Sequence, residues 1–164
     1  MKFVEEHQIC AGFNPVDMNT GANNGDWVSM KLYNHLTCIL FKGIGTAGED
    51  PIFKMQQATA VAGTAAKDLL FTTIYFKAGT LTSIGEFTKV VQAAATSYVN
   101  AVHAEVAAIY VVEFNAEDLD TEGGFDCVQA SVADIGAGAN PQLGACLYIL
   151  SEPRHTPPPS AIVD

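Results

Sequence analysis

The sequence has no long hydrophobic run, no cluster of basic residues and no closely spaced cysteine pair. None of its apolar stretches approaches the roughly 18 to 20 residues that a membrane-crossing helix needs, because Thr, Lys, Gly or Asp interrupts each one. With 8 basic against 18 acidic residues, and a net charge of −10, it has no run of Lys or Arg to neutralise a phosphate backbone. We therefore expect no membrane contact and no direct binding to nucleic acid.

The beginning of the sequence also lacks the form of a signal peptide. A single Lys is followed by Glu5 and Glu6, whereas a signal peptide has a basic start and then an apolar segment. This predicts a protein that is made in the cytoplasm and is soluble there. The acidic charge fits solubility, although it would also favour a basic surface on any docking partner.

Motifs for metal binding and nucleophilic catalysis are missing as well. The four cysteines form no CxxC motif, and three of them lie in apolar, strand-like runs, which predicts buried free thiols: Cys10, Cys38, Cys127 and Cys146. No GxSxG is present, and no histidine has an acidic or thiol partner at helix or strand spacing. The glycine-rich stretch 43–48 is followed by Pro51 and a strand pattern, not by the helix that a phosphate-binding loop requires. We predict a protein without enzymatic activity, metal or cofactor.

Two local features have a structural interpretation. The acidic group Glu117, Asp118, Asp120 and Glu122 does not have the ligand spacing of a calcium loop and is typical of a solvated turn. Asn115, with Asp118 three residues later, predicts the start of a single helical turn. The one tryptophan, Trp27, begins a strand pattern, so we expect it to pack in the core.

The residues that are abundant predict strands. At 164 residues, 49% hydrophobic and 16% charged, the chain suits one domain with a substantial core. Alternating or β-branched apolar runs predict strands at 28–33, 36–41, 52–59, 69–77, 86–92, 105–114, 125–134 and 143–150. Asn34-His35 predicts a tight connection between the first two. Around Asn100 the pattern favours two joined strands, with a short helix as the alternative.

Together these runs predict a mainly β fold, an antiparallel β-sandwich or jelly roll formed by residues 19–151. Residues 1–18 are expected to form an extended N-terminal arm. Residues 152–164 contain four of the seven prolines and are expected to form an extended tail.

The order of segments resembles that of small structural proteins of tailed-bacteriophage virions, the β-rich capsid decoration or cement proteins. The resemblance is carried by VDMNTGANNGDWVSMKLYNH (16–35) and CILFKGIGTAGEDPIFKMQQAT (38–59), and continues through LLFTTIYFKAG, FNAEDLD and FDCVQASVADIG. It covers most of residues 16–150 and includes no catalytic signature. The PPPSAIVD ending has no counterpart in that group.

This resemblance implies a virion protein that is made in the host bacterial cytoplasm and binds the outer surface of the capsid. Its partners would be the major capsid protein and other copies of itself, as a trimer or dimer. Terminal arms often supply the contacts in such proteins, and an arm strand could add to a neighbour's sheet edge. The expected partner-binding residues are Phe3, Ile9, Phe13, Pro157, Pro158 and Pro159.

Two other functions remain open from the residues alone. A head-fibre or tail-associated module could bind a host-surface glycan through Trp27 and tyrosines. An enzyme with a site assembled only in space is the third possibility, but no residue pattern favours it.

Overall fold

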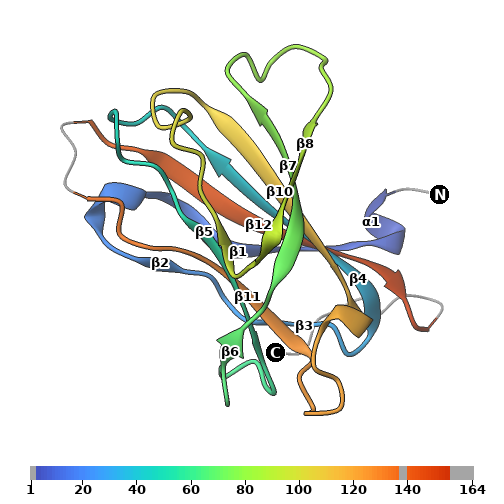
Figure 1. The fold of residues 1–164 in the computed structure, drawn as a ribbon. Coiled ribbons are helices and arrows are strands. Elements are labelled where there is room, and N and C mark those ends of the chain that lie inside the picture. The colour runs from blue at the N-terminus through green and yellow to red at the C-terminus, as the bar shows by residue number, and fades with distance from the viewer. Residues whose placement is uncertain (1–2, 137–139, 156–164) are drawn as a thin grey trace.

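The computed structural model describes residues 3–136 and 140–155. Its larger sheet has six antiparallel strands in the order β1-β12-β4-β10-β7-β8 (Figure 1). These are β1 (Gln8–Asp17), β12 (Leu143–Pro153), β4 (Tyr33–Lys42), β10 (Ala108–Asn115), β7 (Phe71–Ala78) and β8 (Thr88–Ala95). The hairpin of β7 and β8 extends beyond the rest of the sheet at one end (Figure 1).

The smaller sheet has the order β2-β11-β5-β6, and two short strands pair beside this path. Its strands are β2 (Asn23–Asn24), β11 (Cys127–Val132), β5 (Phe53–Ala58) and β6 (Lys67–Asp68), with β3 (Val28–Ser29) on β11 and β9 (Ser97–Tyr98) on β5. The helical segments are α1 (Phe3–Glu6) and the 3-10 turns η1 (Met18–Thr20) and η2 (Ala116–Asp118). The expected mainly β, antiparallel architecture is confirmed.

The core lies between the two sheets, in the arrangement of a β-sandwich. Alternate residues of β4 point inward, so Leu36, Cys38 and Leu40 are fully buried while the residues between them face outward. The Tyr148 ring of β12 reaches across this core, and the backbone N–H of Ala130 in β11 donates a 2.8 Å hydrogen bond to its hydroxyl. This bond joins the two sheets where both backbones are buried.

The predicted connection at Asn34-His35 is wrong. Both residues lie inside β4, which runs without a break from Tyr33 to Lys42. Both fit a strand because they lie at the start of β4, where Asn34 is exposed and His35 finds polar partners on the outward surface. The preceding predicted strand is reduced to Val28–Ser29, which pairs with β11 in the other sheet.

Residues 8–17 of the expected N-terminal arm form β1, an edge strand of the larger sheet. β1 pairs antiparallel with β12 from Gln8 to Asp17, with register shifts on either side of Phe13. Pro15 and these irregularities are features that blunt a sheet edge. An extended arm is therefore not confirmed for this segment, which belongs to the domain's own sheet.

Part of the expected tail is also in the sheet, since Glu152 and Pro153 end β12. Pro157, Pro158 and Pro159 lie outside the described residues. Around Asn100 the chain forms strands β9 and β10, which are joined by turns. The alternative prediction of a short helix there is wrong. The helical turn expected at Asn115 is confirmed as η2, where the Asp118 carboxylate accepts a 2.7 Å hydrogen bond from the Asn115 N–H.

Candidate binding face

The outer surface of the larger sheet is unusually apolar for a surface in contact with water. Half of the outward residues of β4 and β10, and most of those of β12, are aliphatic or aromatic, so part of each strand is apolar on both surfaces. Strand pairing places these outward side chains next to one another: Ile9, Ile39, Phe41, Ile109, Val111 and Leu147, which we call the apolar face. Phe41 is 53% exposed, Ile9 45% and Leu147 41%, so no other part of the described chain covers them.

A shallow hollow lies beside the apolar face on its β7 side. It has a volume of about 230 Å³ and is lined by Tyr75, Phe87, Val111 and Glu113. Val111 pairs with Tyr75 of β7 on one side and with Ile39 of β4 on the other, so the hollow is in direct continuity with the apolar face. A single large aliphatic side chain from another molecule would fit in such a space.

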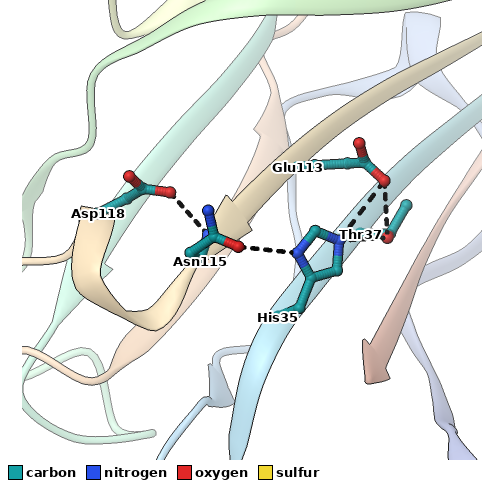
Figure 2. A network of polar contacts seen from close by, with 5 residues as sticks. All are labelled: His35, Thr37, Glu113, Asn115 and Asp118. Carbon is teal, nitrogen blue, oxygen red and sulfur yellow. Dashed lines mark hydrogen bonds and ion pairs between the residues drawn. The ribbon is translucent and has the colours of Figure 1, made fainter. Parts of the chain in front are cut away.

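A network of polar contacts joins the start of β4 to the end of β10 (Figure 2), next to the apolar face in the β4–β10 register. His35 Nδ1 lies 3.1 Å from Asn115 Oδ1, and His35 Nε2 lies 3.5 Å from Glu113 Oε1. The Thr37 hydroxyl donates to the same Glu113 oxygen at 3.4 Å. These contacts join neighbouring strands because Thr37 pairs with Glu113 and His35 with Asn115 in the β4–β10 register.

The chemistry available to this network is polar recognition. Thr37 Oγ1 lies 3.5 Å from His35 Nε2, so the imidazole contacts polar groups of both β4 and β10. Glu113 is the shared acceptor, and its carboxylate is half-exposed. The arrangement orients side chains on an open sheet surface, where they can bind polar groups of a partner.

A polar cleft of about 440 Å³ opens next to this network. Its lining comes from the end of β12, the η2 turn and the residues around them: Asn34, Asn115, Ala116, Glu117, Thr121, Glu152 and Arg154. The Arg154 side chain is held by a 2.9 Å hydrogen bond from its Nε to Asn34 Oδ1. Amides, carboxylates and a guanidinium are groups that bind hydroxyls, but no aromatic ring lines this cleft.

At the opposite end of the sheet, Lys42 is buried among backbone carbonyls. Its ammonium donates to the carbonyl oxygen of His103 and, at 3.1 Å, to that of Ala104. Burial lowers the pKa of Lys42 to about 8, against the opposing effect of the Asp50 carboxylate. Burial, together with the Lys42 charge, also lowers the pKa of His103, whose ring lies 2.9 Å from the Tyr110 hydroxyl. These groups hold the 99–107 loop onto β4.

The acidic group after β10 is occupied by local contacts. Lys67 and the Gly123 N–H both bond to Asp120, and these interactions lower the pKa of the Asp120 carboxyl. The Asp118 carboxylate accepts the hydrogen bond from the Asn115 N–H. Among residues 3–136 and 140–155 no three His, Cys, Asp or Glu side chains gather in a way that could hold a metal ion.

The structure separates the residues expected to bind a partner. Ile9 lies in the apolar face. Phe3 is half-exposed in α1 and stacks on His7 with ring centroids 4.1 Å apart, while Phe13 packs against the core. The sequence patterns did not single out Ile39, Phe41, Val111 and Leu147. Their signal is the presence of apolar residues at both odd and even positions of 36–41 and 143–150.

The aromatic residues expected for glycan binding are mostly inaccessible. Four of the five tyrosines belong to the buried core, which leaves Tyr75 partly exposed: the buried ones are Tyr33, Tyr98, Tyr110 and Tyr148. Trp27 is half-buried and lies outside the core cluster, so its expected core position is wrong. Its indole edge lies against Gly63.

Comparison of the chain with protein-family models, with curated proteins and with solved structures finds no match. In the part of the chain that the structure describes, every helical segment is too short to cross a bilayer.

Proposed function

We propose that the protein is a non-enzymatic structural protein of a bacteriophage virion, which binds the outer surface of the capsid and stabilises it. The observation that carries this proposal is the strand order. We count eight strands in chain order and treat β2 and β3 together as the second. The eight are β1, β2/β3, β4, β5, β6, β10, β11 and β12. The larger sheet then has the order first, eighth, third, sixth, and the smaller one second, seventh, fourth, fifth.

From this order we infer a jelly roll, with the β7–β8 hairpin as an addition beside its sixth strand and β9 as an addition beside β5. Jelly rolls are typical of viral capsid proteins and of lectins. The resemblance of residues 16–150 to capsid decoration proteins supports the first of these classes. The apolar face supports a function in assembly, because exposed patches of this kind usually mark protein interaction sites.

In this proposal the partners are the major capsid protein and further copies of the chain. The exposed Phe3 of α1 and the proline-rich segment 156–164 remain the proposed capsid contacts, since Ile9 belongs to the apolar face and Phe13 to the core's edge. Weak contacts suffice when one oligomer engages several capsid subunits, because each later contact forms at high effective concentration.

The test is co-sedimentation of the purified full-length protein with expanded phage heads that lack it, followed by cryo-electron microscopy. We expect saturable binding and density at the junctions between capsomers. A Phe3→Asp variant should bind more weakly, and Val102→Asp, which places the same charge on an exposed loop, should bind normally. Bare heads at saturating protein would refute the proposal.

A glycan-binding head-fibre or tail module is the second candidate, favoured by the polar cleft next to η2. The jelly roll is also a lectin fold. If this candidate is correct, a glycan array will show specific binding that Asn115→Ala or Arg154→Ala abolishes. Binding that depends instead on Trp27 would place the glycan outside this cleft.

A further inference from the structure

The apolar face is a candidate docking surface, because strand pairing gathers exposed apolar side chains on one side of the sheet. Monomeric soluble proteins rarely expose contiguous apolar patches of more than a few hundred Å². The six side chains of the apolar face span four adjacent strands from β1 to β10, and the hollow extends this surface to β7. Another molecule that covered this surface would remove these side chains from water.

The charge of this surface indicates what the partner is. The chain as a whole has a net charge of −10, yet the outward positions paired around the apolar face have two basic residues, Lys77 and Lys89, and one acidic residue, Glu113. A basic partner would be attracted to the other, acidic surfaces. A second copy of this chain can approach through this surface without the repulsion that its other surfaces would produce.

The whole outer face of the larger sheet, of which the apolar face is a part, is wide enough for a stable dimer interface. A ten-residue strand such as β4 is about 33 Å long, and six strands spaced about 4.8 Å apart are roughly 25 Å wide. One face of the sheet therefore covers on the order of 800 Å², the area that each partner contributes to a standard protein interface.

We propose that two copies pack face to face through the apolar face, about a two-fold axis that runs along the strands between β4 and β10. These are the third and fourth of the six strands, so the axis passes through the middle of the sheet. It places β4 of one copy against β10 of the other, and β12 against β7. Sheets that pack face to face keep their strands roughly aligned, which this axis satisfies.

The register makes the two surfaces complementary. Leu147, Ile39, Val111 and Tyr75 lie in one row across β12, β4, β10 and β7. The axis brings Ile39 of each copy over Val111 of the other. It also brings Leu147 over Tyr75, where the 230 Å³ hollow can accept its side chain. An interface of this kind is isologous, since the same contact is made twice.

The charged groups also agree with this packing. By the same register, Lys77 of one copy faces Ala145 of the other, Lys89 faces Ala11, and Glu113 faces Thr37. No charge is placed opposite a like charge. A dimer formed in this way covers the apolar face, and its formation can be measured without a capsid, so the inference does not depend on whether the chain binds one.

The first experiment measures mass by light scattering and by sedimentation across a range of concentrations, without any capsid. We expect the wild-type chain to be a dimer. Leu147→Asp should weaken dimerisation by on the order of a hundredfold or more, because two carboxylates would have to be buried. The control is Val102→Asp, which adds the same charge to an exposed loop residue and should leave the dimer intact. Circular dichroism and thermal unfolding verify that both variants fold.

The second experiment tests the register. Leu147→Cys and Tyr75→Cys proteins are mixed and treated with a short bis-maleimide, and the products are compared with those of each variant alone and of the wild type. The mixture should give the most covalent dimer, because the proposed packing puts position 147 of one variant directly over position 75 of the other. In a dimer of one variant alone, the two introduced cysteines are offset by three strand spacings, about 14 Å. A wild-type monomer at every concentration would overturn the proposal. So would a dimer that tolerates Leu147→Asp and shows no enhanced cross-linking.

Discussion

Trp27 packs its indole edge against Gly63, at a turn where the backbone has a left-handed conformation. Gly63 has φ +75°, and a Cβ at this position would lie 2.7 Å from Trp27 Nε1. The contact therefore requires glycine for two separate reasons, backbone conformation and space. As the one tryptophan in the sequence, Trp27 also reports on this contact by its fluorescence.

We predict that Gly63→Ala destabilises the protein by more than about 1 kcal/mol and shifts the emission of Trp27. The matched control is Gly48→Ala, because Gly48 has φ +81° but nothing within 4 Å of its Cβ position. Both variants have backbone strain, and only the first displaces the indole. Urea unfolding and fluorescence spectra measure the difference, and equal effects in the two variants would show that the Trp27 contact contributes nothing.

Some residue-scale properties could be predicted from the sequence. The cysteines in apolar strand runs, Cys38, Cys127 and Cys146, are buried as expected, because a thiol among aliphatic neighbours behaves as a small hydrophobic group. The position of Trp27 could not be predicted. It depends on Gly63, whose turn lies far along the chain, and on strand β3 being only two residues long.

At the scale of the elements, η2 depends on one side chain of its first turn. The Asp118 carboxylate satisfies the Asn115 N–H, and Leu119, directly after the turn, is buried. We predict that Asp118→Ala lowers stability by about 0.5–2 kcal/mol, the usual cost of losing such a cap. Glu117→Ala, which removes an exposed carboxylate from the same turn, should change stability by less than about 0.5 kcal/mol. Chemical unfolding of the two variants tests this, and an equal loss in both would indicate an effect of charge alone.

The strands of the core were largely predictable, but the binding face was not. Alternation predicted β5, and β-branched and aromatic content predicted β7 and β10, since these patterns report burial of one side of a strand. A run such as 36–41 is apolar on both sides and predicts a strand buried on both sides. Only the pairing of β4 with β10 and β12 shows that Ile39 and Phe41 face outward beside Val111 and Leu147.

The whole molecule should lose stability in alkaline solution. Burial raises the pKa of Cys127 and Cys146 from 9.0 to about 12. Between these values the unfolded chain releases protons that the folded chain retains. Each thiol should therefore reduce stability by about 1.4 kcal/mol per pH unit above pH 9.

Lys42 acts in the opposite direction over part of this range. Its pKa is 10.5 when unfolded and about 8 when folded, so the unfolded chain binds the extra proton and stability rises between these values. We expect a small rise from pH 8 to 9, a decline above pH 9 and a steeper decline above about pH 10.5. Urea unfolding in the presence of a reductant measures this profile. Cys146→Ala should reduce the decline, because it removes one of the two thiols whose pKa is raised to about 12; a profile unchanged from the wild type would contradict the assignment.

The pairing of β1 with β12 has a consequence for how the chain folds as it is made. β1 has one neighbour in the sheet, and that neighbour is the last strand, residues 143–153. Synthesis proceeds at about 5–20 residues per second, so the N-terminal strand waits several seconds with its backbone unpaired. β12 pairs with both β1 and β4, so neither of these two pairings can form before residues 143–153 have been made. The larger sheet can therefore be completed only after β12, which lies between β1 and β4, has left the ribosome.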